Sequence, residues 1–432
     1  MQEDVHFSGE TAYQRTLQQV QDLGVSIETI IDVGSSNGPW SFMAKEIIPD
    51  AHCHLIEANP HWKSSLEWIV SEYPDFSFVM AAAGPEDGEI QFSYVAEDPY
   101  SGYVSLGDSV ATTISVPMIT IDKEVERLNL KPPYLIKLDT HGFERGILKG
   151  ASRTLRQTAL LVTECYNIMR EEDRRFPEMV QFYEGLGLKC IQLVAPMFRP
   201  FDDALWQFDL AFLDNRYLSD QSHDLLPDPG STSFLQTTDA LRRITRRGIE
   251  VASIIDVGGG DGSWSRMAQQ ILPEARIHII ETDSRWRASL EMLSQQDQKF
   301  SYSIGEPSID EIVSQFKLRP PYLIRINIPD QERQILASAK KTLRLCHLLV
   351  ARCYNFPDDP RQLFAPMVQF YEGLGFRTID MAEIVQRPSG KAMWSLDFFF
   401  VSAKRPEANI YDYDKPTWCG NGYWDATGDQ SG

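Results

Sequence analysis

The fold of this chain is decided by the stretch IIDVGSSNG, residues 30–38. Its apolar first residues are typical of a short strand that is covered on both faces, and Gly34 and Gly38 suit a tight turn. Apolar residues then recur at helical spacing from Trp40 to Ile48, which predicts a helix. A strand, a glycine turn and a helix place backbone N–H groups and a helix N-terminus beside an open crevice, where a nucleotide-like ligand can bind.

The next predicted strand, residues 54–56, ends in Glu57. An acidic side chain at this place can accept hydrogen bonds from the hydroxyls of a ribose. The alternative is a structural turn followed by a surface glutamate. The turn itself lacks the Gly-x-Gly-x-x-Gly fingerprint of dinucleotide-binding proteins and has the form Asp-x-Gly-x-x-x-Gly. Such a turn suits a nucleoside that has no pyrophosphate, and S-adenosylmethionine is a ligand of that kind.

Length and composition limit the classes of protein to which this chain can belong. Its 432 residues allow about two to four domains. The 61 acidic and 41 basic residues give a formal charge of −20, which argues against nucleic acid or an anionic membrane as a partner. The six cysteines include no C-x-x-C pair and do not make a disulfide framework. Because the first residues lack the pattern of a signal peptide and no apolar run has the length of a membrane span, we expect a cytoplasmic protein.

Three stretches of the sequence occur twice. IIDVG at residues 30–34 recurs 224 residues later, whereas PPYLI at 132–136 and MVQFYEGLG at 179–187 each recur 188 residues later. A period of this size predicts two copies of one domain, the second 36 residues shorter, and not a solenoid. The expected parts are a first domain at residues 1–218, a linker at 219–232, a second domain at 233–405 and an aromatic and glycine-rich tail at 406–432.

Strand-like and helix-like patterns alternate along each predicted copy. This alternation is typical of a doubly wound α/β fold with a mainly parallel sheet. The last two predicted strands of the first copy, residues 189–194 and 207–213, indicate a terminal antiparallel pair. The expected fold class is therefore α/β, with two tandem Rossmann-like domains, each a doubly wound, mainly parallel sheet that carries an antiparallel terminal strand.

A second group of polar residues follows a later predicted strand, in KLDTHGFE, residues 137–144. Ligands bind at this edge of an open α/β sheet, so we expect Asp139, His141 and Glu144 to gather over the crevice. Glu164 ends the neighbouring strand at the same edge. A carboxylate–imidazole group there can take the proton of a hydroxyl that attacks a methyl sulfonium. The structural alternatives are a helix cap for Asp139, a favourable helix-dipole charge for Glu144 and a hydrogen-bonded turn for His141.

These motifs, in this order, resemble the FkbM-type family of S-adenosylmethionine-dependent methyltransferases. The motifs are Asp-Val-Gly-x-x-x-Gly from residue 32, Ile-Glu-Ala-Asn-Pro from residue 56, Thr-Ile-Asp from residue 120, Lys-Leu-Asp-Thr-His-Gly-Phe-Glu from residue 137 and Leu-Lys-Gly-Ala from residue 148. The resemblance spans residues 26–213 and implies a class I methyltransferase fold. It also implies transfer of a methyl group to oxygen, often on sugar hydroxyls of glycans or on secondary metabolites.

The resemblance assigns cofactor and acceptor sides to the first copy. Asp139, His141 and Glu144 would face the acceptor, and Glu164 completes the expected catalytic set. The residues expected to bind S-adenosylmethionine are Asp32, Gly34, Ser35, Asn37, Gly38, Glu57, Ala58, Asn59 and Ala82. No metal ligand is expected. The alternative is a divalent ion at Asp139 and Glu164, because transfer to oxygen can use a Lewis acid.

The second copy keeps the cofactor-side pattern, from Asp256 to Gly262 and at Glu281, but loses the reaction side. An asparagine, a proline and an arginine stand where the first copy has its aspartate, histidine and last glutamate (Asn327, Pro329 and Arg352). Asparagine cannot take a proton, and proline has neither a titratable ring nor a backbone N–H. We therefore expect the second copy to be catalytically silent and to serve as a scaffold, a dimer-like partner or a lid.

The sequence thus predicts an S-adenosylmethionine-dependent O-methyltransferase whose first copy acts on a hydroxyl of a sugar, a glycan or a secondary metabolite. The expected partner is a small-molecule or glycan acceptor, with no nucleic acid and no membrane, and a homo-oligomer is compatible with the pattern. The main alternative is a non-catalytic tandem protein that binds or scaffolds. An NAD-linked oxidoreductase is a further alternative, which the missing pyrophosphate fingerprint disfavours.

Overall fold

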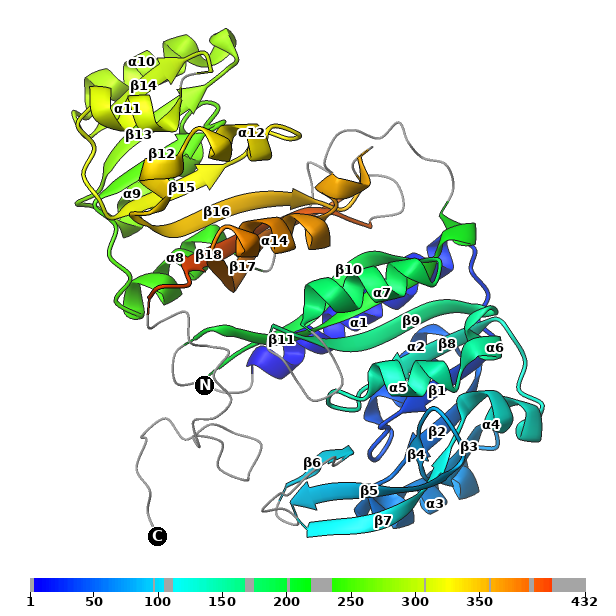
Figure 1. Cartoon of the computed structure of the whole chain (residues 1–432). Coiled ribbons are helices and arrows are strands. Elements are labelled where there is room, and N and C mark those ends of the chain that lie inside the picture. Colours follow the sequence, from blue (N-terminus) through cyan, green and yellow to red (C-terminus); the bar gives the residue numbers. More distant parts are fainter. Residues whose placement is uncertain are drawn as a thin grey trace.

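A computed structural model of the chain describes residues 4–95, 98–104, 112–167, 175–199, 203–218, 235–306, 308–356, 359–387 and 392–405. The expected linker at 219–232 and the expected tail at 406–432 lie outside these residues. The described residues form two lobes, the first up to residue 218 and the second from residue 235, each built on a seven-stranded sheet (Figure 1). No helix of the described residues has the length and apolar character needed to cross a membrane.

The main sheet of the first lobe has the strand order β10-β11-β9-β8-β1-β2-β3. Its strands are β1 (Thr29–Val33), β2 (His52–Glu57), β3 (Phe76–Met80), β8 (Tyr134–Leu138), β9 (Thr158–Tyr166), β10 (Leu188–Phe198) and β11 (Leu205–Asp214). Neighbours pair in parallel except β11, which is antiparallel to both β9 and β10. A mainly parallel sheet with a terminal antiparallel strand confirms the predicted fold class.

Helices cover both faces of this sheet, as in doubly wound folds. Successive residues of β1 point to opposite faces, so Ile30 and Ile31 belong to two different apolar layers. The helices of the layer with Ile30 are α1 (Asp4–Asp22), α2 (Pro39–Ile47) and α3 (Lys63–Glu72). The helices of the layer with Ile31 are α4 (Ile121–Leu128), α5 (Glu144–Lys149) and α7 (Phe176–Gly185), with the short α6 (Ser152–Leu155) after α5.

A separate four-stranded sheet is inserted into the first lobe between β3 and α4 (Figure 1). In the order β4-β7-β5-β6, its strands are β4 (Ala82–Ala83), β7 (Thr112–Ile119), β5 (Gly88–Val95) and β6 (Asp98–Val104). At the equivalent place in the second lobe, β14 (Phe300–Ile304) is followed directly by α11 (Ile309–Gln315). The insertion therefore accounts for the length difference between the two predicted copies. The sequence did not predict β6, which is short and polar.

The second lobe repeats the arrangement of the first. Its sheet has the order β14-β13-β12-β15-β16-β18-β17, which is the order of the first sheet read from the other edge. Its other strands are β12 (Ser253–Val257), β13 (Arg276–Glu281), β15 (Tyr322–Ile326), β16 (Cys346–Tyr354), β17 (Phe376–Gln386) and β18 (Met393–Ser402). Its other helices are α8 (Thr237–Arg246), α9 (Ser263–Ile271), α10 (Arg287–Gln296), α12 (Glu332–Ala337), α13 (Lys340–Leu343) and α14 (Phe364–Gly373).

The two lobes pack together through α7 and α14 and through their terminal strands (Figure 1). Asn167 Nδ2 donates a hydrogen bond to Thr378 O at 2.8 Å, and Asn355 Nδ2 donates one to Cys190 O at 2.6 Å. The members of each pair are related by the same shift of 188 residues, so each lobe gives the other an equivalent hydrogen bond. The interface thus has the reciprocal character of a two-fold dimer interface.

Because one apolar cluster of buried residues runs through both lobes, we predict that they unfold together. Calorimetry of the full chain should give a single transition. The double variant Asn167→Ala, Asn355→Ala leaves buried carbonyl groups without donors and should lower the melting temperature, at about 1–3 kcal/mol for each substitution. Gln181→Ala, which removes an exposed hydrogen bond between α7 and α14, should change it little. Two separate transitions in the unmodified chain would contradict the prediction.

Candidate active site

The turn after β1 carries several of the predicted cofactor-side residues. Gly34 has a left-handed backbone with φ of 75°, and its N–H donates to Ile56 O at 2.9 Å. No side chain fits there, because a Cβ atom would lie 2.0 Å from the carbonyl oxygen of Asp139. Gly38, with φ of 82°, then precedes α2 as its N-cap. The glycine turn is therefore pressed directly against the residue that follows β8.

Glu57, the last residue of β2, holds the same turn. Its carboxylate accepts hydrogen bonds from the backbone N–H groups of Ser36 at 2.7 Å and Asn59 at 2.6 Å. Burial raises the pKa of Glu57 to about 7, although these hydrogen bonds act in the opposite direction. Ser36 adopts φ of 48°, a conformation that is unusual for a residue other than glycine and that recurs at functional sites. The sequence analysis did not select Ser36, since only the folded turn identifies it.

Two further predicted residues flank this turn, and a third lies below it. Asp32 is fully buried and its Oδ2 accepts a hydrogen bond from Ser41 Oγ at 2.8 Å. Burial raises the pKa of Asp32, and the charge of Lys137 opposes that shift. Ser35 is buried within the turn, whereas Asn37 is partly exposed beside it.

Asn59 connects the turn to the inserted sheet. Its Nδ2 donates to Pro99 O, in β6, at 2.9 Å. The rings of Trp62 and Tyr100 lie next to this hydrogen bond in the sequence, with their centroids 4.9 Å apart. Two more of the predicted cofactor residues are the partly buried Ala58 and the buried Ala82, in β4. The inserted sheet is therefore in contact with the cofactor side of the site.

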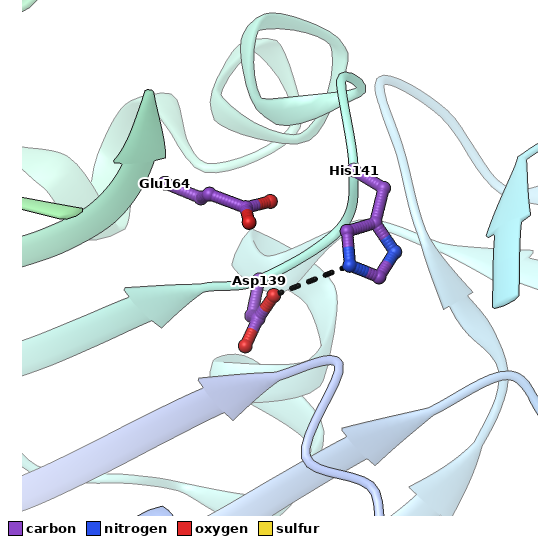
Figure 2. Close-up of side chains that lie close together, drawn as sticks. All are labelled: Asp139, His141 and Glu164. Atoms are coloured by element: carbon purple, nitrogen blue, oxygen red, sulfur yellow. Dashed lines mark ion pairs between the residues drawn. The ribbon is translucent and has the colours of Figure 1, made fainter. Parts of the chain in front are cut away.

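Asp139, His141 and Glu164 converge at the carboxyl ends of β8 and β9 (Figure 2). His141 Nε2 lies 3.7 Å from Asp139 Oδ1. The polar atoms of the three side chains lie within 4.8 Å of one another. The structure thus brings together three of the four predicted reaction-side residues. This spacing would also admit a divalent cation, which is the alternative raised by the sequence.

The other ring nitrogen of His141 defines the proton arrangement of the imidazole. His141 Nδ1 lies 2.9 Å from Gly102 O, in β6. A carbonyl oxygen can only accept a hydrogen bond, so Nδ1 carries the hydrogen of the neutral ring and Nε2 carries the lone pair. The side chains of His141 and Asp139 are 25% and 39% exposed, so solvent can reach both. The inserted sheet therefore contacts the reaction side of the site as well as the cofactor side.

Glu144 does not join the group that Figure 2 shows. Its side chain is completely buried at the start of α5. Its Oε1 accepts hydrogen bonds from Thr140 Oγ1 at 3.0 Å and from Gly142 N at 3.2 Å. In this position Glu144 shapes the loop that carries His141.

The sequence analysis missed the surroundings of Glu164. Its carboxylate accepts hydrogen bonds from Tyr166 and Gln207. Asp209, opposite Glu164 on β11, accepts a hydrogen bond from the hydroxyl of Tyr13 in α1. Burial, followed by the charges of two neighbouring carboxylates, raises the pKa of Asp209 to about 8. An aspartate in the middle of an otherwise apolar predicted strand was the available signal.

The second lobe has the cofactor-side geometry without the reaction-side group. Gly258 has φ of 75°, as Gly34 has, and Gly260 N donates to Glu281 Oε2 at 2.7 Å, as Ser36 N donates to Glu57. On the reaction side, Arg352 forms an ion pair with Asp397 at 2.7 Å. These two residues occupy the places of Glu164 and Asp209.

Comparisons with known proteins agree with this division. Residues 32–190, which contain both halves of the site, match the family described as "Methyltransferase FkbM domain". No curated protein matches the chain. Similar solved structures include precorrin-6y C5,15-methyltransferase from Geobacter metallireducens, at 15% identity over 40% of this chain and 93% of that chain, with a TM-score of 0.27. Another is a SAM dependent methyltransferase from Aquifex aeolicus, at 11% identity over 39% of this chain and 90% of that chain, with a TM-score of 0.26.

These structural similarities are too distant to add to the argument, which rests on the family match and on the site. The family match covers the glycine turn, Glu57 and the group at the ends of β8 and β9. Residues 32–190 are therefore a methyltransferase FkbM domain, and the protein is an S-adenosylmethionine-dependent methyltransferase.

Proposed function

We propose that the first lobe transfers the methyl group of S-adenosylmethionine to a hydroxyl oxygen of a sugar, a glycan or a secondary metabolite. The observation that carries this proposal is the imidazole of His141. Its Nδ1 is bound to the carbonyl of Gly102, and its Nε2 lone pair faces Asp139. A lone pair held in this way can take the proton of a hydroxyl. The net charge of −20 favours a neutral acceptor over an anionic one.

The cofactor is proposed to lie over the glycine turn. The absence of a side chain at Gly34 lets a ligand approach the backbone, and the helix that begins after Gly38 offers further N–H groups. Glu57 is placed to accept hydrogen bonds from the ribose hydroxyls. The other proposed contacts are Asp32, Ser35, Asn37, Ala58, Asn59 and Ala82.

The chain's own residues carry the proton in the proposed reaction. S-adenosylmethionine supplies a methyl group on a positively charged sulfur. The acceptor oxygen forms a bond to the methyl carbon as the carbon–sulfur bond breaks, and its proton passes to His141 Nε2. Asp139 and Glu164 stabilise the resulting imidazolium, because their carboxylates lie within 4.8 Å of the ring nitrogen. The exposed edge of His141 then releases the proton to water.

The second lobe is proposed to have a structural role. Its reaction side is closed by the ion pair of Arg352 and Asp397, and its asparagine and proline cannot take a proton. It covers α7 and the terminal strands of the first lobe through reciprocal hydrogen bonds. In this way the second lobe takes the place that a second subunit has in a dimer.

His141→Ala should lower kcat by about 10²–10⁴-fold, since that is the usual contribution of a positioned acid–base residue. Asp139→Asn should lower kcat less and leave the binding of S-adenosylhomocysteine intact. The assay follows labelled methyl from S-adenosylmethionine into glycans and small molecules of a cell extract. The matched control is Pro329→Ala, at the equivalent place of the second lobe, which should have the wild-type rate. Full turnover by His141→Ala would contradict the proposal, and inhibition by a chelator that Mg²⁺ reverses would favour the metal alternative.

Gly34→Val should abolish the binding of S-adenosylhomocysteine to the full chain, because a side chain at this position collides with the carbonyl of Asp139. Gly258→Val is the matched control: its Cβ would meet Asn327 O at 2.4 Å in the second lobe. It carries a similar steric cost but should leave cofactor binding and turnover in the first lobe unchanged. Isothermal titration measures both variants, and equal losses of affinity would contradict the assignment of the cofactor to the first lobe.

The pKa of Glu57 predicts a pH dependence of cofactor binding. Below its pKa of about 7, Glu57 is protonated and accepts hydrogen bonds from a ribose less well. The affinity for S-adenosylhomocysteine should therefore rise with pH up to about 7 and then level off, by at most about tenfold for each pH unit. Glu57→Gln should remove this dependence, whereas Glu281→Gln should preserve it. A flat profile for the unmodified chain would show that Glu57 does not contact the ligand in its ionised form.

A further inference from the structure

Lys137 places a buried positive charge between the two halves of the site. It lies on β8 beside Asp32 on β1, with which it is paired in the strand register. Its side chain is 5% exposed. Its Nζ lies 2.9 Å from Asp139 Oδ2 and 3.8 Å from Asp32 Oδ1. The ammonium thus stands between an acid of the cofactor side and an acid of the reaction side.

The charge of Lys137 is shared unequally between these two acids. Asp32 Oδ1 is buried and accepts no hydrogen bond within the described residues, whereas Asp139 Oδ2 accepts one from Lys137. A buried ammonium is costly unless it is paired. Burial therefore acts to lower the pKa of Lys137, but the charges of Asp139 and Asp32 outweigh it and raise the pKa. Lys137 stays cationic and holds mainly to Asp139.

The second lobe has the opposite arrangement. Arg325, at the place of Lys137, donates to Asp256 Oδ1 at 2.8 Å and lies 4.8 Å from the ring centroid of Trp264. Asn327 is neutral and stands where the first lobe has Asp139. Where the reaction-side carboxylate is missing, the cation belongs to the cofactor-side acid alone. The comparison indicates that the contact of Lys137 with Asp139 goes together with the reaction-side group.

We propose that Lys137 is a positioning residue, which holds Asp139 through Oδ2 so that Oδ1 faces His141, and which links Asp139 to Asp32 beneath the cofactor turn. This inference rests on the proposed function of the first lobe. Lys137 is too deeply buried to meet the acceptor, so it acts through Asp139. Its charge keeps Asp139 ionised at the pH values at which His141 has to take up a proton.

The charged and titratable groups that face Asp139 come from several elements. They are Asp32 on β1, Lys137 on β8, His141 in the following loop, Glu164 on β9, Asp209 on β11 and Tyr13 on α1. Burial acts to raise the pKa of Asp139, but Lys137 and then His141 lower it. The carboxylates in this group act in the same direction as burial. Removal of the Lys137 charge should therefore raise the pKa of Asp139.

The test is the pH profile of kcat for Lys137→Met and Lys137→Arg in the full chain. In Lys137→Met, Asp139 becomes protonated at higher pH, so the acid limb of the profile should move to higher pH and kcat at pH 6 should fall at least about tenfold, the effect of one pKa unit. Lys137→Arg keeps the charge, but the longer guanidinium should turn to Asp32, as Arg325 turns to Asp256, and the acid limb should move in the same direction. The control Arg325→Lys, in the second lobe, should leave the profile unchanged.

Outcomes of this test separate the inference from the proposed function. If His141→Ala and Asp139→Asn lose turnover while both Lys137 variants keep the wild-type profile, Lys137 is not a positioning residue and the inference is overturned. A uniform loss of kcat at every pH would also overturn it, because a purely structural defect has no pH signature. If His141→Ala keeps full turnover, the proposed function fails first. Binding of S-adenosylhomocysteine checks that each variant is folded, and Lys137→Arg provides the readout if Lys137→Met does not fold.

Discussion

The contact between Gly34 and the backbone of Asp139 is the constraint on which the rest of the site depends. With no side chain at Gly34, the turn after β1 can lie against the carbonyl of Asp139, where a Cβ atom would come within 2.0 Å. The turn that receives the cofactor and the strand end that carries the reaction group therefore meet at one edge of the sheet. Parallel strands place their carboxyl ends at that edge in any doubly wound fold, but the glycine sets how closely they approach.

The part of the site that follows local sequence patterns could be predicted. A buried strand, a glycine turn and an acid at the end of the next strand are all encoded within a few dozen residues, so Gly34, Glu57 and Asp139 could be placed from spacing alone. The contacts of His141 with Gly102 and of Tyr13 with Asp209 could not, because they join segments that are 39 and 196 residues apart. They depend on how the inserted sheet and α1 pack on the main sheet.

The role of a charged residue was also hard to predict from its position. Glu144 and Glu164 are both glutamates near the ends of buried strands, yet Glu144 turns inward to its own loop and Glu164 turns to the reaction group. The direction of each side chain is set by its hydrogen-bond donors, which are Thr140 and Gly142 for the first. Lys137 has the sequence pattern of a strand residue, and only the packed sheet shows that its ammonium lies between two acids.

The two lobes show which parts of the structure serve the fold and which serve the reaction. Both have the same strand order, the same left-handed glycines and an acid that accepts N–H groups from its turn. Since these features occur in a lobe without a reaction group, they are sufficient to build the turn but not to carry out transfer. The difference lies in the inserted sheet and in the charges at the ends of β8 and β9, which the second lobe replaces with the ion pair of Arg352 and Asp397.

The most direct test of this account is a crystal structure of the full chain with S-adenosylhomocysteine. The account predicts that the ligand lies in the first lobe, with its ribose hydroxyls at Glu57 and its sulfur directed toward His141 Nε2. A ligand seated only in the second lobe, or one whose sulfur points away from Asp139 and His141, would contradict it.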